Sequence, residues 1–95
     1  MATFVIAIKV TKDSNNNPIE FTKQYYIYMS RYDSFLRDDK LAVEFKTIEG
    51  ALSWWNNYKL RYPERIMQVM EFADPESLSI RQRRTTYKLT EKLTI

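Results

Sequence analysis

The chain has 95 residues, with 15 Lys and Arg against 12 Asp and Glu, and a formal net charge of +3. This length predicts a single domain over residues 1–95 that can bury a hydrophobic core. The sequence has no cysteine and no histidine, which excludes a disulfide framework, a thiolate metal site and the most common general base. Its single glycine excludes phosphate-binding loops, which need several glycines at fixed spacing.

The apolar segments are short, and none has the length of a membrane-spanning helix. Residues 4–8 are apolar, but they follow no basic leader and precede no cleavage site, so we do not interpret them as a signal peptide. We therefore expect a cytoplasmic protein with no membrane partner.

Two strands joined by a polar turn are predicted for residues 3–30. Apolar residues alternate over residues 3–12, which is typical of a strand with one buried face. Asp, Ser and Asn in residues 13–18 favour a turn, since their side chains bond to nearby backbone and Asn tolerates positive φ. Residues 19–30 alternate again, with Lys23 interrupting the apolar face, and predict the returning strand of a hairpin.

Tyr26 and Tyr28 fall on the more polar face of that second strand. One interpretation is structural, because tyrosine favours strands and its ring covers neighbouring side chains. The other is functional: the two rings form an aromatic platform for a side chain of a partner or for a nucleic-acid base.

Residues 30–40 are polar and charged, and we expect an irregular segment in which Phe35 and Leu36 return to the core. The adjacent acids Asp38 and Asp39 could bind a divalent cation. No third acid at ligand spacing supports a calcium loop, so we interpret both carboxylates as solvated and predict no metal site.

Residues 41–72 predict a strand, a helix and a second strand. Period-two alternation marks a strand over residues 41–46, and Thr47 is a good N-cap for the helix that follows. Apolar residues then recur at helical spacing over about 48–62, and Pro63 should end this helix. Residues 65–72 are almost continuously apolar, which we interpret as a strand near the middle of the sheet.

Two adjacent tryptophans lie on the predicted helix. Trp55 belongs to the apolar stripe, and Trp54 lies at its margin. Trp54 either packs beneath a flanking strand or loop, or remains partly exposed as an anchor for a partner, since tryptophan is enriched among residues that dominate binding energy.

The C-terminal part begins with a turn at residues 74–76, where Asp and Pro favour a helical start. Residues 78–84 are compatible with either a helix end or a strand, and residues 86–95 predict a last strand at a sheet edge. The chain is therefore expected to be α+β: an antiparallel-rich sheet of about four or five strands with the helix at 48–62 on one face.

Basic residues gather in this C-terminal part: Arg81, Arg83, Arg84 and Lys88. Such a run can pair with phosphates and give salt-dependent binding to nucleic acid. It can equally form a solvated face or bind an acidic protein, and the net charge is small for a dedicated DNA-binding protein.

Residues 40–53 are similar to the third strand and following helix of an RNA-recognition motif. The positions of that family's stacking aromatics hold Lys40 and Ala42, so the similarity implies no RNA-binding residues here. In composition, the short chain rich in Lys, Asn and Tyr resembles small proteins of phages and prophages. That resemblance implies a binding protein that modulates or inhibits a host factor.

The sequence thus favours a small non-catalytic interaction protein that binds another protein or self-associates, for example as a homodimer. Its predicted partner-binding residues are Trp54, Tyr26 and Tyr28. The alternative is a nucleic-acid-binding protein that uses its basic C-terminal segment. No catalytic residue, cofactor or small-molecule substrate is predicted, because an enzyme would need a converging carboxylate pair that the spacing does not suggest.

Overall fold

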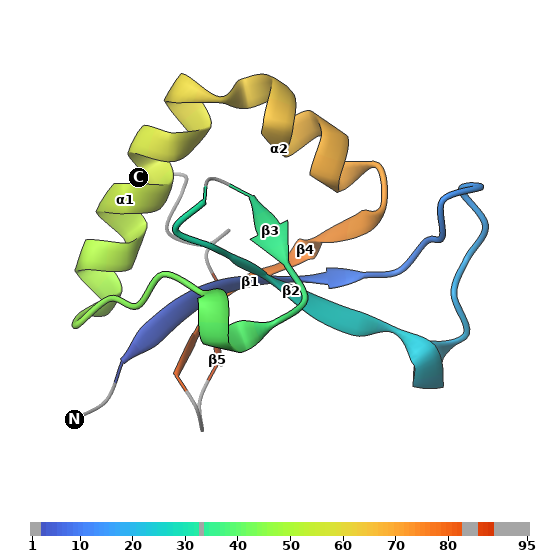
Figure 1. Ribbon diagram of the computed structural model, residues 1–95, viewed down its shortest axis with the longest axis horizontal. Helices are drawn as coiled ribbons and strands as arrows, with labels where there is room; N and C mark the ends of the chain where they lie inside the picture. Colours follow the sequence, from blue (N-terminus) through green and yellow to red (C-terminus); the bar gives the residue numbers. More distant parts are fainter. Residues whose placement is uncertain (1–2, 33, 83–85, 89–95) are drawn as a thin grey trace.

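The computed structural model describes residues 3–32, 34–82 and 86–88, and over these residues it is α+β, as the sequence predicts. In this part of the chain, five antiparallel strands form one sheet in the order β3-β2-β1-β4-β5. The strands are β1 (Phe4–Val10), β2 (Tyr25–Met29), β3 (Phe35–Leu36), β4 (Ala73–Gln82) and β5 (Thr86–Lys88). The helices are α1 (Ile48–Arg61) and α2 (Pro63–Met70), with short 3-10 helices η1 (Phe21–Lys23) and η2 (Asp39–Leu41). Both α-helices lie on the same side of the sheet (Figure 1).

Strand β1 is the centre of the sheet, since it pairs with β2 on one side and β4 on the other. The prediction of a strand over residues 3–12 is therefore confirmed. Its residues Ile6 and Ile8 are fully buried and join Met29, Trp55 and Ile80 in the core beneath the helices.

The hairpin turn is built as its composition predicts. The Asp13 carboxylate accepts hydrogen bonds from the backbone N–H groups of Asn15 and Asn17, both at 2.9 Å, and Asn16 adopts a φ of 64°. The returning strand is shorter than predicted, because residues 21–23 form η1, in which the Gln24 N–H donates to the Phe21 carbonyl.

The predicted strand over residues 41–46 is wrong. The Asp38 carboxylate accepts the Lys40 N–H at 2.9 Å and so caps η2, which ends at Leu41. The chain then runs extended but makes only isolated bridges, from Ala42 to Ser30 and from Phe45 to Phe4. Local capping by Asp38 overrides the alternation that suggested a regular strand.

Helix α1 follows the sequence prediction closely. The Thr47 hydroxyl accepts the Gly50 N–H at 3.0 Å as N-cap, and the helix buries Ala51, Trp55 and Tyr58. It ends at Arg61, close to the predicted boundary. Pro63 does not end the helical region, however, since it occupies the first turn of α2, where its missing N–H costs nothing.

The predicted central strand over residues 65–72 is also wrong, because this segment forms α2. Its apolar residues Ile66, Val69 and Met70 fall on one helical face and pack against the core. A short apolar run fits the period of a strand and that of a helix, and here Pro63 at the helix start favours the helix.

Residues 78–82 belong to β4, which resolves the ambiguity at 78–84 for the described residues. The predicted turn at residues 74–76 is present as an irregularity within this strand, where the register shifts between Ala7 and Lys9. The Ser77 hydroxyl accepts the Lys9 N–H at 2.8 Å and donates to the Asp74 carbonyl at 2.7 Å, so it replaces the missing ladder bond. Of the predicted last strand at 86–95, β5 is described and residues 89–95 lie outside the described residues.

Replacing Trp55 by alanine tests the core. Trp55 is 1 % exposed, so Trp55→Ala should lower the free energy of unfolding by about 4 kcal/mol through lost burial and an unfilled cavity. Leu60 on the same helix is 78 % exposed, and Leu60→Ala should change it by about 0.5 kcal/mol or less. Urea denaturation followed by circular dichroism measures both, and equal losses would contradict this packing of α1.

Candidate functional site

The face of the sheet turned away from α1 and α2 carries three of the residues that the sequence singled out: Tyr26, Tyr28 and Arg81. Alternation along the paired strands brings Val5, Ala7 and Lys9 of β1 to this face, beside two tyrosines of β2 and two residues of β4. We call this surface the tyrosine face: Val5, Ala7, Lys9, Tyr26, Tyr28, Ser79 and Arg81.

Two small residues form the floor of the tyrosine face. Ala7 is fully buried although α1 and α2 lie on the other side of the sheet, and Ser79, its partner on β4, is 2 % exposed. Tyr28 stands directly opposite Ala7, and Tyr26 is the next residue of β2 on this face. We attribute the burial of Ala7 to these rings, since an alanine leaves room for a neighbouring ring to lie across it. The Ser79 hydroxyl has no hydrogen-bond partner in the described part of the chain.

Cations from β1 and β4 contact the Tyr26 ring. The Arg81 guanidinium of β4 lies 4.1 Å from the ring centroid, and the Lys9 ammonium lies 5.8 Å from it. Such contacts contribute about 0.5 to 1 kcal/mol at exposed sites. The contact with Arg81 therefore joins β2 to β4 across the central strand and restricts both side chains before any ligand arrives.

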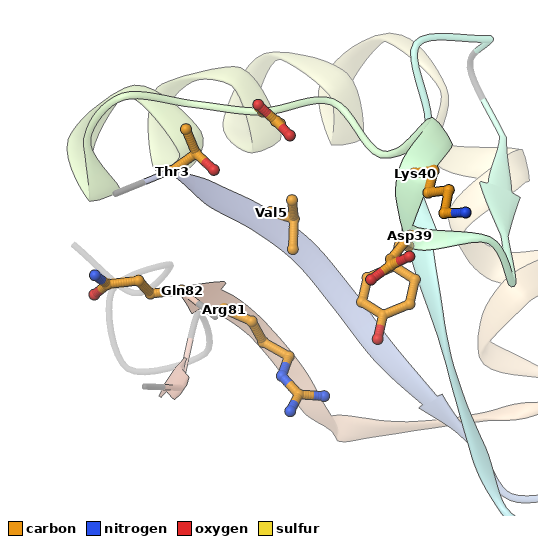
Figure 2. Close-up of a pocket in the computed structure, with 8 residues that line it drawn as sticks. Thr3, Val5, Asp39, Lys40, Arg81 and Gln82 are labelled. Carbon is orange, nitrogen blue, oxygen red and sulfur yellow. The ribbon is translucent and has the colours of Figure 1, made fainter. Parts of the chain in front are cut away.

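A hollow of about 510 Å³ adjoins the tyrosine face. Figure 2 shows Val5 of β1 between Arg81 of β4 and the η2 residues Asp39 and Lys40. The full lining is Thr3, Val5, Tyr28, Asp39, Lys40, Glu44, Arg81 and Gln82. Two basic and two acidic side chains thus edge the hollow, and among the described residues no ion pair joins these four to one another.

The structure brings together three residues that the sequence assigned to different sites. Tyr26 and Tyr28 were predicted to bind a protein partner and Arg81 to bind nucleic acid, and all three lie on the tyrosine face. Arg83 and Arg84 lie outside the described residues, and of Lys88 only the backbone, in β5, is described.

Trp54 lies apart from the tyrosine face, on α1. Its ring stacks on Tyr58 at 5.1 Å with an angle of 11° and tilts against Phe45 at 5.7 Å. It is partly buried and packs against the core cluster. Trp54 therefore packs against a flanking segment, as the first interpretation expects, and its role as a partly exposed anchor stays a prediction.

Sequence reasoning missed the residues around the hollow. The hollow is lined by Asp39, Lys40 and Glu44 because η2 carries the chain past β2. The sequence had predicted a loop followed by a strand in this segment. The capping signal of Asp38 two residues before Lys40 was the feature that could have revealed η2. That Arg81 faces Tyr26 depends on the register of β4, which alternation alone does not specify.

The tyrosine face and its hollow present aromatic rings beside basic and acidic side chains. Within the described residues, no group of three or more His, Cys, Asp or Glu side chains could hold a metal ion. No helix in that part of the chain is long and apolar enough to cross a membrane. Comparison of the chain with protein-family models, with curated proteins and with solved structures found no match.

Replacing Trp54 by alanine tests whether it is structural. Because Trp54 stacks on Tyr58 and Phe45, Trp54→Ala should lower the free energy of unfolding by about 2 kcal/mol, less than Trp55→Ala. Urea denaturation gives this value, and sedimentation velocity gives the association state. An unchanged unfolding energy with a lost oligomer would instead make Trp54 an exposed anchor.

Proposed function

We propose that this protein is a non-catalytic binding protein that recognises another protein, or a second copy of itself, through the tyrosine face. The observation that carries the proposal is the gathering of Tyr26, Tyr28 and Arg81 on one side of the sheet, next to a hollow edged by charged groups.

The residue types support recognition of a protein. Tyrosine and arginine are enriched among the interface residues that contribute most of the binding energy. A tyrosine ring supplies a large contact area with few rotatable bonds, so its ordering costs little. Since Arg81 already lies against the Tyr26 ring, part of the ordering cost is met before binding.

The charges beside the tyrosine face favour a protein over a polyanion. Lys40 and Arg81 would attract a phosphate backbone, whereas Asp39 and Glu44 at the same hollow would repel it. A protein segment that carries charges of both signs can pair with all four groups at once. Such complementarity contributes more to the choice and orientation of the partner than to affinity.

Selection from a library of displayed random peptides tests this proposal. Peptides enriched on the wild-type protein should bind Arg81→Ala and Tyr28→Ala about tenfold more weakly, because each variant removes a contact worth about 1.4 kcal/mol. The matched control is Arg61→Ala, which removes an exposed arginine on α1, on the other side of the sheet, and should bind like the wild type. Isothermal titration calorimetry gives the affinities.

Two results bear directly on the partner. If the selected peptides bind wild type and both tyrosine-face variants equally, the tyrosine face is not the binding surface. If sedimentation shows a wild-type dimer that Arg81→Ala dissociates, the partner is a second copy of the chain, in keeping with the proposal.

Nucleic acid is the second candidate, because a cation stacked on an aromatic ring is a feature of single-strand binding surfaces, and Arg81 with Tyr26 provides one. Fluorescence anisotropy with labelled single- and double-stranded DNA and RNA measures it. Affinity should fall steeply between about 50 and 200 mM salt, and Arg81→Ala should weaken it. No complex at micromolar protein in low salt would exclude this function.

A further inference from the structure

A second hollow surface lies on the helix side of the sheet, away from the tyrosine face. Two adjoining hollows of about 370 and 440 Å³ lie between α2 and the β2–β3 edge and share the lining residues Phe35, Gln68 and Val69. We call this surface the α2 groove. Its first half is lined mainly by apolar side chains: Val10, Tyr25, Ile27, Phe35, Val69 and Phe72.

The α2 groove stays open because both of its walls are short. Strand β3 has 2 residues and α2 has 8, so neither covers the side chains that β2 directs toward the helices. Val69 packs partly against the core, whereas Phe72, just past the end of α2, remains 39 % exposed. An apolar side chain from outside could therefore lie between Phe72 and the sheet without displacing the core.

Strand β2 offers an unpaired edge beside this groove. Pairing with β3 covers only Tyr28 and Met29. The Ser30 N–H points to the β3 side, where it donates to the Ser34 carbonyl at 2.8 Å. Since backbone groups alternate in direction along a strand, the N–H and C=O of Tyr26 point to the same side. Within the described residues no strand pairs with Tyr26 there.

Among the described residues, the charged side chains that line the α2 groove are basic. Lys12 lines its first half and Arg65 its second, and the Arg37 guanidinium lies 4.2 Å from the ring centroid of Tyr25, which also lines it. No Asp or Glu is among the described residues that line either half. An occupant with carboxylates next to its apolar side chains would be electrostatically complementary.

We propose that the α2 groove binds an extended acidic segment of a partner protein. The segment adds as a strand to the edge of β2 at Tyr26 and places an apolar side chain between Val69 and Phe72. Its carboxylates lie beside Lys12 and Arg37. In this binding mode, backbone hydrogen bonds supply the affinity and alternate side chains supply the specificity. The α2 groove is a different site from the tyrosine face.

The charge argues against a second copy of the chain as occupant. The chain carries a net charge of +3, so two copies that meet at a groove edged by cations repel each other. A free fatty acid would match the charge and the apolar lining but leaves the edge of β2 unused.

Synthetic peptides test the proposal directly. The probe is a fluorescein-labelled peptide of about ten residues in which Thr alternates with Glu, Leu or Phe, so that acidic and apolar side chains share the strand face that meets the groove. One comparison peptide replaces every Glu by Lys, and another replaces the apolar residues by Ser. We expect the acidic apolar peptide alone to bind at micromolar concentration in fluorescence anisotropy, and its amide shift changes in NMR to centre on Tyr26, Gln68 and Phe72.

Exposed side chains in the α2 groove allow variants that should fold. Gln68 lines both halves and Lys12 the first, so Gln68→Glu and Lys12→Glu should each weaken the acidic peptide about tenfold. The matched controls are Asn57→Asp on α1 and Lys46→Glu, which make the same charge changes at exposed positions outside the groove and should bind like the wild type.

Three results would overturn the proposal: no binding of the acidic peptide at submillimolar protein, equal binding of its lysine counterpart, or NMR changes that centre on Arg81 and Tyr28. Dodecanoate-induced NMR shift changes at Gln68 and Phe72, together with no peptide binding, would assign the groove to an amphiphile. A dimer that Gln68→Glu dissociates would assign it to a second copy. The tyrosine face is tested by Arg81→Ala and Tyr28→Ala, so either surface can fail without the other.

Discussion

Among the described residues, helices cover the sheet on one face only, and the tyrosine face follows from this constraint. Helices α1 and α2 supply 14 and 8 residues, and their apolar side chains pack over Ile6, Ile8 and Ile80. An antiparallel sheet is stable with one face buried and the other in contact with water. The second face must then consist of side chains that both cover the backbone and tolerate solvent, which tyrosine and arginine do through apolar bodies with polar ends.

Ala7 determines how that second face is arranged. A large residue at the centre of β1 would stand between β2 and β4 and separate their side chains. Alanine leaves the space through which Arg81 of β4 reaches the ring of Tyr26 of β2, at 4.1 Å. The contact between Arg81 and Tyr26 therefore depends on the small side chain of Ala7 on the strand between them.

Three elements with clear local signals were predicted correctly, whereas the alternating residues 41–46 and the apolar residues 65–72 were both wrongly predicted as strands. The alternation of β1, the turn with Asn16 at positive φ and the Thr47 cap of α1 are all local signals, and the structure contains all three. Residues 65–72 carry an apolar run that fits a strand or a helix, so periodicity could not choose. The sequence identified Tyr26 and Arg81 separately but not their contact. That contact depends on the register of β4, which an irregularity near Asp74 sets.

The alternation of β2 explains how so small a sheet can carry two surfaces that share no side chain. Tyr26 and Tyr28 point to the tyrosine face, while Tyr25 and Ile27 point into the α2 groove. The two surfaces meet only in the backbone of Tyr26, whose N–H and C=O lie at the open edge and whose ring is held by Arg81. A strand added at that edge would order the backbone that positions the ring.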